Sequence, residues 1–511
     1  MIRALLAAAT AAFVTVCLAG CQLLPLLGEP SSSSTSTPTG ESVDGALEPF
    51  YRQTVEWESC ERGMQCATVL APLNWDDPAE GTIELAVIRS LATGDRLGSL
   101  FVNPGGPGGS GWEFVAYSSF PGLDAAYDIV GWDPRGVSRS EAITCYTENA
   151  DRDEALYGTF DSPYDTPGWI EELTTVSEDY AAACLTNTGP LLGHIDTVST
   201  VRDLDLMRAV LGDEKLAYLG YSYGTKIGAT YAELYPDKVG RMVLDGAVDP
   251  MLSDFEGLKT QMAGFESAFR AYMASCLRED LCPFTGTVDT ALAQARELIE
   301  SVGQQRLVAD DGRVLDEATI ATGVAINLYS ESYWPDMTVM FADLRGGDPN
   351  SAFLNADYYN SRNPGGGYSG NSVDAYQAIT CADGDFLDDP ASTLDRVAEI
   401  DAAAPTIGRF FTYDDFAVLD VLCTHWPVPV STPPTEYDAA GAPPILVIGT
   451  SNDPATPYAW AQSLAGQLES GVLISYEGEG HTIYNQGVTC IDDVVDAYFV
   501  RGIVPTADPF C

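Results

Sequence analysis

The chain has 511 residues, with 25 Lys and Arg against 74 Asp and Glu, giving a formal net charge of −49 at pH 7. So acidic a surface repels phosphate backbones, which argues against a nucleic-acid partner and is typical of a soluble, salt-adapted exterior. A hydrophobic content of 46% allows a large core, arranged as one domain with an insertion or as two domains.

The N-terminus has the pattern of a bacterial export signal. Arg3 precedes an apolar run, residues 4–18, which is short for a membrane span but sufficient for a signal-peptide core. The run ends in Leu-Ala-Gly-Cys (residues 18–21), which resembles a lipobox and implies lipidation of Cys21; an ordinary secretory signal is the alternative. We therefore expect an exported protein, anchored by lipid on Cys21 to the outer face of the cell membrane or released to the envelope or medium.

Strand and helix patterns alternate over the first half of the chain. Alternating apolar residues over 66–90 predict an antiparallel opening to a sheet, and the later strands and helices predict a mainly parallel α/β sheet. The later strands are expected at 100–102, 127–132, 215–220 and 241–245, and the helices at 197–211 and 225–235.

The strand rhythm stops near residue 249 and returns at 444–449 and 472–476, before a final helix at 491–500. The intervening chain is rich in helical stretches, which indicates a mainly parallel α/β core with a large, mostly helical lid, or cap, inserted into it. The expected division is a signal peptide at 1–20, a flexible tether rich in Ser, Thr, Pro and Gly at 21–46, core at 47–249, cap at 250–435 and core at 436–511.

Ten cysteines remain after Cys17 and Cys21, and an even set in an exported chain predicts disulfides. We expect sequential pairing, although the sequence leaves the connectivity open. A zinc site is the competing interpretation, but there is no CxxC pair, no HExxH motif and only three histidines, so neither metal nor cofactor is expected. The expected pairs are Cys60–Cys66, Cys145–Cys184, Cys276–Cys282, Cys381–Cys423 and Cys490–Cys511.

The motif Gly-Tyr-Ser-Tyr-Gly (residues 220–224) lies between a predicted strand and a predicted helix. G-x-S-x-G in that context is the nucleophile elbow of α/β-hydrolases, whereas the bare pentapeptide is equally consistent with an ordinary glycine-rich turn. A serine hydroxyl needs a base to take its proton and a carboxylate to orient that base. We therefore interpret Ser222 as a nucleophile and look downstream for its partners.

His481 follows the strand at 472–476, so its loop falls at the carboxyl end of the sheet, where ligands bind in such folds. His425, beside a cysteine and a tryptophan, and His194, which precedes the elbow, are expected to be structural. The candidate acid is Asp453, after the strand at 444–449; Asp245, at the end of an earlier strand, is its rival. Asp453 is preferred because its loop adjoins the strand that delivers the histidine.

The oxyanion hole needs backbone N–H donors aimed at the developing charge. One is expected from Tyr223, directly after the nucleophile, and the other from the loop Asn-Pro-Gly-Gly-Pro-Gly-Gly-Ser-Gly at 103–111. Proline has no N–H, so Gly106 is the expected donor and Gly105 the alternative. A phosphate-binding loop is the competing interpretation, but the Lys-Ser/Thr of a P-loop and the GxGxxG spacing are absent.

Five ordered motifs together carry a family resemblance: residues 103–111, Gly-Trp-Asp-Pro-Arg-Gly (131–136), residues 220–224, Asp-Pro-Ala-Thr-Pro (453–457) and Gly-His-Thr (480–482). They resemble the actinobacterial secreted tripeptidyl aminopeptidases, relatives of proline iminopeptidases among the α/β-hydrolase serine peptidases. They also resemble a mycobacterial cell-envelope serine hydrolase described as a protease and as a carboxylesterase. The resemblance covers nearly all of the chain after residue 47.

That resemblance implies cleavage from a free N-terminus, with the substrate's ammonium held by acidic groups under the cap. The expected protein is a membrane-anchored extracytoplasmic serine peptidase, acting as a monomer, that releases short, tripeptide-like N-terminal peptides through an acyl-enzyme. A carboxylesterase or endopeptidase using the same triad is the alternative, because the chemistry is shared and only the cap pocket discriminates. A catalytically silent binding lipoprotein is the interpretation from another class.

Overall fold

The computed structural model describes residues 34–384, 392–413, 417–506 and 508–511. The predicted signal peptide and Cys21 lie outside these residues. Within the described ranges, no helix combines the length and the apolar character needed to cross a membrane.

The described strands form one ten-stranded sheet in the order β1-β2-β3-β4-β6-β5-β7-β8-β9-β10. Pairing is antiparallel from β1 through β4 and between β4 and β6, and parallel from β6 onward to β10. The mainly parallel sheet and its antiparallel opening, both expected from the sequence, are confirmed. The strands are β1 (Ser34–Ser36), β2 (Val55–Ser59), β3 (Gln65–Pro72), β4 (Thr82–Ser90), β5 (Gly98–Asn103), β6 (Tyr127–Trp132), β7 (Leu216–Tyr221), β8 (Val239–Asp245), β9 (Ile445–Asn452) and β10 (Gly471–Glu479).

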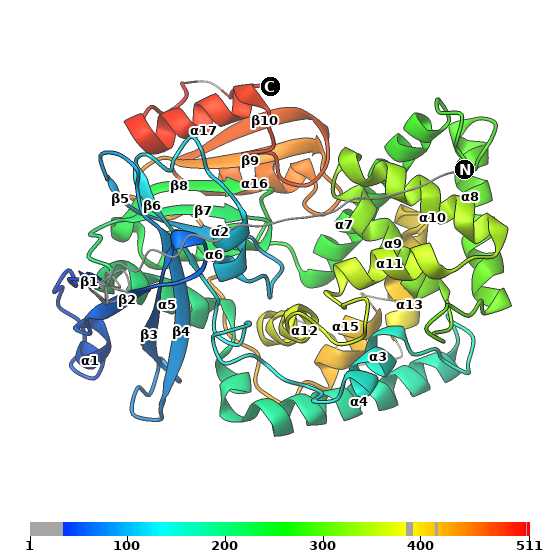
Figure 1. Ribbon diagram of the computed structural model, residues 1–511, viewed down its shortest axis with the longest axis horizontal. Coiled ribbons are helices and arrows are strands. Elements are labelled where there is room, and N and C mark those ends of the chain that lie inside the picture. The colour runs from blue at the N-terminus through cyan, green and yellow to red at the C-terminus, as the bar shows by residue number, and fades with distance from the viewer. Residues whose placement is uncertain (1–33, 385–391, 414–416, 507) are drawn as a thin grey trace, which may run out of the picture.

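Helices cover both faces of this sheet (Figure 1). Successive residues of β5 point to opposite faces: Phe101 belongs to the cluster that includes α5, α6 and α16, while Leu100 and Val102 belong to the cluster with α2 and α17. Burial on both faces explains why the central strands are continuous apolar runs. The core helices are α1 (Glu48–Tyr51), α2 (Gly111–Tyr117), α5 (Thr197–Val210), α6 (Tyr223–Leu234), α16 (Tyr458–Gln467) and α17 (Thr489–Arg501).

The chain between β8 and β9 forms the cap, and most of its helices enclose a hydrophobic cluster of their own. Two earlier helices, α3 and α4, join it: α4 packs against α15, and both lie beside the cap helices in Figure 1. The cap helices are α3 (Asn149–Tyr157), α4 (Pro167–Thr188), α7 (Asp254–Cys276), α8 (Val288–Gln305), α9 (Glu317–Leu328), α10 (Trp334–Gly346), α11 (Asn350–Tyr359), α12 (Ser372–Asp383), α13 (Thr393–Ala403), α14 (Gly408–Phe411) and α15 (Ala417–Thr424).

Helix α4 connects the two hydrophobic clusters, a role that the expected division at 47–249 does not include. Trp169 and Leu173 near its start are buried in the cap cluster, while Tyr180 and Cys184 near its end are buried in the core cluster. The expected division assigned α4 to the core alone, whereas part of it packs in the cap. A run of apolar residues along a helix shows that one face is buried, but not which part of the protein covers that face.

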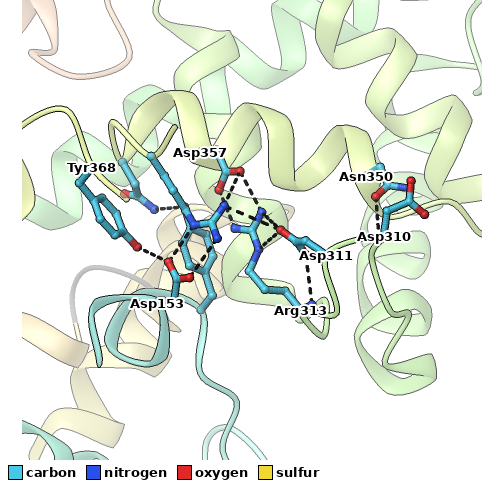
Figure 2. Close-up of polar contacts among 10 residues, drawn as sticks. Asp153, Asp310, Asp311, Arg313, Asn350, Asp357 and Tyr368 are labelled. Atoms are coloured by element: carbon cyan, nitrogen blue, oxygen red, sulfur yellow. Dashed lines mark hydrogen bonds and ion pairs between the residues drawn. The ribbon is translucent and has the colours of Figure 1, made fainter. Parts of the chain in front are cut away.

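A charged cluster fastens α3 to the rest of the cap (Figure 2). Asp153 accepts hydrogen bonds from Tyr368 at 2.7 Å and from Nε and Nη2 of Arg362 at 2.8 and 2.9 Å. Beside it, Arg313 forms a two-pronged pair with Asp357 of α11 at 2.6 and 2.8 Å. Such geometry favours a fixed arrangement of the segments that carry these residues.

Residues 34–46 of the expected tether are bound to the core. Strand β1 pairs antiparallel with β2, and Glu41 lies 2.9 Å from Arg208 Nη2 and 2.9 Å from Lys238 Nζ. The composition favoured a flexible segment, but backbone groups of Ser and Thr still pair with an exposed strand edge. A tether extending to residue 46 is therefore not what the structure shows.

The ten described cysteines form five disulfides, and their pairs are the sequential ones expected from the sequence. Two of them brace the cap region: Cys145–Cys184 ties α4 to the segment before α3, and Cys381–Cys423 ties α12 to α15. Five disulfides fit a protein that folds outside the reducing cytosol. The pairs are Cys60–Cys66, Cys145–Cys184, Cys276–Cys282, Cys381–Cys423 and Cys490–Cys511.

Candidate active site

Ser222 occupies the sharp turn between β7 and α6, with φ 55° and ψ −125°. A non-glycine residue in such a conformation is strained by about 1–3 kcal/mol, and the surrounding structure must hold it there. A Cβ atom on Gly220 would lie 2.4 Å from the Gly224 carbonyl oxygen, and one on Gly224 would lie 2.9 Å from the Asn103 carbonyl oxygen. The two glycines thus allow the turn that places the serine at the N-terminus of α6, whose partial positive charge favours a developing anion.

Asp453 follows β9 and His481 follows β10, so the ends of neighbouring parallel strands bring the two side chains together. His481 Nδ1 lies 2.9 Å from each carboxylate oxygen of Asp453. The carboxylate is buried and also accepts the N–H groups of Ala455 and Thr456 at 2.9 and 2.8 Å. These contacts fix the carboxylate, which in turn places the imidazole proton on Nδ1.

The other ring nitrogen of His481, Nε2, is buried and has no hydrogen-bond partner among the described residues. His481 and Ser222 line the same cavity. Burial alone would lower the pKa of His481, but the Asp453 carboxylate outweighs that effect and the pKa is raised. The ring can therefore take a proton at Nε2 while the carboxylate stabilises the resulting positive charge.

The glycine-rich loop after β5 packs directly against the serine. A Cβ atom on Gly105 would lie 2.9 Å from Ser222 Cβ and 3.0 Å from the Tyr223 nitrogen. The Gly105 N–H already donates to Asn103 Oδ1 at 2.9 Å, whereas the Gly106 N–H has no partner among the described residues. Tyr223 is the first residue of α6, where a backbone N–H has no intrahelical acceptor. The expected pair of donors, Gly106 and Tyr223, thus has free N–H groups in this loop and turn.

The remaining candidates from the sequence lie in other environments. His425 Nδ1 is 3.5 Å from Glu178 Oε1, and the carbonyl of His194 accepts a hydrogen bond from Arg135 at 2.8 Å; neither histidine lines the cavity. Asp245 does not contact the imidazole nitrogens; its carboxylate accepts backbone N–H groups of the loop after His481 instead.

The cavity beside Ser222 has a volume of about 1260 Å³ and is lined by both core and cap. Small-molecule sites are commonly about 300–1,000 Å³, so this one has room for several residues of a peptide. On the cap side, Phe265 and Phe411 contribute apolar surface and Gln377 and Thr380 contribute polar groups.

Tyr329, at the end of α9 in the cap, is a contact that sequence reasoning missed. Its carbonyl accepts the His481 N–H at 2.9 Å, and its ring stands edge-on to the imidazole with centroids 5.2 Å apart. No local motif marks this tyrosine, because the contact depends on how the cap docks. The cap therefore helps to position the candidate base directly.

Charged groups also line the cavity. Lys226 Nζ lies 3.1 Å from Asp383, and Arg396 Nη1 lies 2.8 Å from Asp420 outside the cavity, so both cations are neutralised. Asp249 and Asp254 are the other two carboxylates of the described lining. The family resemblance implied acidic groups under the cap without identifying them; the carboxylates of the described lining are Asp249, Asp254 and Asp383.

Comparison with known proteins places the chain in a family. The family model described as TAP-like protein matches residues 410–511. Serine protease Hip1 of Mycobacterium tuberculosis is 35% identical, covering 91% of this chain and 92% of that protein. Carboxylesterase B of the same organism is 36% identical, with 96% and 95% covered, and tripeptidyl aminopeptidase of Streptomyces lividans is 31% identical, with 90% and 87% covered. The chain therefore belongs to this family of α/β-hydrolases and is a serine hydrolase of the peptidase type.

Proposed function

We propose that the protein is an extracytoplasmic serine aminopeptidase that releases short, tripeptide-like fragments from free N-termini. Ser222 attacks the scissile carbonyl while His481 takes its proton, and Asp453 stabilises the imidazolium. The N–H groups of Gly106 and Tyr223 hold the oxyanion. His481 then gives the proton to the leaving amine, and water hydrolyses the acyl-enzyme by the same route in reverse.

The observation that carries this proposal is the large cavity between the candidate triad and the cap. An internal segment of a protein would have to enter and leave that cavity, whereas a chain end needs only one opening. The volume of about 1260 Å³ accommodates several residues on the N-terminal side of the scissile bond. An exopeptidase therefore fits the site better than an endopeptidase.

We assign the substrate's ammonium group to Asp249. This carboxylate is buried at the cavity wall, and its Oδ1 accepts the Met251 N–H at 3.0 Å and Gln467 Nε2 at 2.8 Å. It has no cationic partner among the described residues, so a substrate ammonium would supply one. Asp254, at the start of α7, is the second candidate.

The test compares Ala-Ala-Pro-anilide with its N-acetylated form on the purified enzyme. We expect kcat/KM to fall at least about 100-fold when the amine is blocked, because an ammonium–carboxylate contact in a buried site contributes several kcal/mol. Equal cleavage of both substrates would refute the aminopeptidase assignment. Asp249→Asn should raise KM for the free amine and leave the acetylated substrate unchanged, and Asp254→Asn tests the second candidate in the same way.

A carboxylesterase is the second candidate function, favoured by the 36% identity to carboxylesterase B. The same triad hydrolyses esters, so both activities will respond to Ser222→Ala. A short p-nitrophenyl ester distinguishes the two: a kcat/KM well above that for the free tripeptide anilide would support the esterase.

We also propose that lipid on Cys21 anchors the enzyme to the outer face of the membrane, as the lipobox-like residues 18–21 indicate. More than one acyl chain is needed for stable anchoring, which a modified N-terminal cysteine provides. Cys21→Ser should move the protein from the membrane fraction to the medium without changing the activity per molecule. Retention of that variant in membranes would exclude lipid as the anchor.

A further inference from the structure

Asp245 is a buried carboxylate that the proposed mechanism leaves without a role. It ends β8, and its Oδ2 accepts the N–H groups of Ile483 at 2.9 Å and Tyr484 at 2.8 Å. Its Oδ1 is buried and has no hydrogen-bond partner among the described residues. Its backbone carbonyl accepts the Ser222 N–H at 2.9 Å. One residue thus contacts both the nucleophile turn and the loop that carries His481.

The histidine loop, residues 480–485, needs such support. Thr482 and Asn485 have φ values of 60° and 67°, in the left-handed region that a β-branched residue such as threonine rarely adopts and that asparagine tolerates better. The loop is held from the cap by Tyr329, which accepts the His481 N–H, and from the core by Asp245. Strained backbone persists only where surrounding contacts determine it, so these acceptors fix the position of the imidazole.

Asp245 also places a negative charge close to the imidazole. A Cβ atom built on the adjacent Gly246 would lie 3.2 Å from His481 Cε1, so the two segments are in contact. The ionisable groups that face Asp245 are His481, Asp453 and Tyr221. Burial raises the pKa of Asp245 to about 6. The two backbone N–H groups and His481 lower this pKa, but their effect is smaller than that of burial. Near neutral pH the imidazole therefore has two carboxylates beside it, and only Asp453 bonds to its nitrogen.

We propose that Asp245 is a positioning residue that fixes the histidine loop and adds a second negative charge to stabilise the His481 imidazolium. The inference rests on the proposed function of the triad. When the Ser222 proton moves to Nε2, the ring becomes positive, and the field of Asp245 favours that state without accepting a proton itself. By accepting the N–H groups of Ile483 and Tyr484, Asp245 Oδ2 keeps the ring in place for the transfer.

Asp245→Asn separates the two contributions, because the amide oxygen still accepts both N–H groups while the charge is lost. We expect kcat to fall about 10-fold with KM nearly unchanged, since the charge acts on the transition state. The acid limb of the kcat/KM profile should move to lower pH by roughly half to one pH unit, because a carboxylate that raises the pKa of His481 is gone. A purely structural role would lower activity without moving that limb.

Asp213→Asn is the matched control. Asp213 is a half-buried carboxylate that accepts a backbone N–H from Ser99 at 3.3 Å and has a buried, unpartnered Oδ2, but it precedes β7 at the opposite end of the sheet. Its variant should keep the wild-type pH profile. If Asp245→Asn gives the same acid limb as wild type, the charge contribution is refuted. If Ser222→Ala retains wild-type activity, the proposed function fails first, and the two failures are distinguishable.

If Asp245→Asn does not fold, the coupling can be measured by titrating His481 in the protein with Asp245 intact. The chain has three histidines, so ring-¹³C labelling gives three signals, and His194→Gln and His425→Gln assign the third to His481. The His481 signal should show a second inflection from the ionisation of Asp245, whose pKa is raised by burial. A titration with a single inflection would overturn the proposed coupling between the carboxylate and the ring.

Discussion

Replacing Gly105 by alanine should disable the site with a single methyl group. The new Cβ would lie 2.6 Å from the Tyr221 carbonyl oxygen, 2.9 Å from Ser222 Cβ and 3.0 Å from the Tyr223 nitrogen, all closer than ordinary contact. Gly105 also has φ 93°, a conformation that costs an alanine about 1–2 kcal/mol. Backbone atoms and the nucleophile itself would have to move, so the donor loop and Ser222 would separate.

A shift approaching 1 Å at a reacting group costs about 100-fold in rate, and loss of one oxyanion donor costs about 3–4 kcal/mol. We therefore expect kcat/KM to fall about 100- to 1,000-fold, while unfolding in urea shows a loss of only about 2 kcal/mol. The assay is the rate of fluorophosphonate labelling together with anilide hydrolysis. The control is Gly466→Ala in α16, where a Cβ meets nothing within 4 Å and activity should be unchanged. Labelling of Gly105→Ala at the wild-type rate would refute the packing argument.

Three further predictions concern stability. Arg135→Met leaves the buried Asp203 carboxylate without its cationic partner, which lies 2.7 Å away. The free energy of unfolding in urea should fall by about 3–5 kcal/mol; a fall below about 1 kcal/mol would contradict this prediction. Removing the Cys381–Cys423 disulfide, with a sequence separation of 42, should cost about 4 kcal/mol in non-reducing unfolding. Asp245 has its folded pKa raised from 3.8 to about 6, so its protonated form is favoured and about 3 kcal/mol of stability is lost as pH rises through that range. Asp245→Asn should therefore melt above wild type at pH 8, and the two should converge at pH 4.

The parts of the site that follow local rules could be predicted from the sequence. The turn at Ser222 is marked by two glycines within one pentapeptide. Chain order and strand position were enough to select Asp453 and His481, whose side chains the structure brings within hydrogen-bond distance of each other. The parallel sheet was predictable for the same reason, because apolar strands alternate with helical stretches. Each residue was recognised from the strand, turn or helix pattern directly around it.

Contacts that depend on docking between distant segments could not be predicted. Tyr329 reaches His481 only because the cap packs on the core, and nothing near residue 329 indicates it. Asp245 was considered only as a rival acid, since its bonds to Ile483 and Tyr484 join positions more than 200 residues apart. The burial of α4 in two different hydrophobic clusters could not be predicted for the same reason. An amphipathic pattern shows that one face of a helix is buried, but not which part of the protein covers it.

Ser222 is the proposed nucleophile, with His481 as its base and Asp453 as the carboxylate bonded to that base. The most direct measurement is to label the purified protein with a fluorophosphonate near neutral pH and map the adduct by peptide mass spectrometry. We expect one adduct on Ser222, lost in Ser222→Ala and formed more slowly by orders of magnitude in His481→Ala. No labelling of the wild type, or an adduct on another serine that persists in Ser222→Ala, would contradict it.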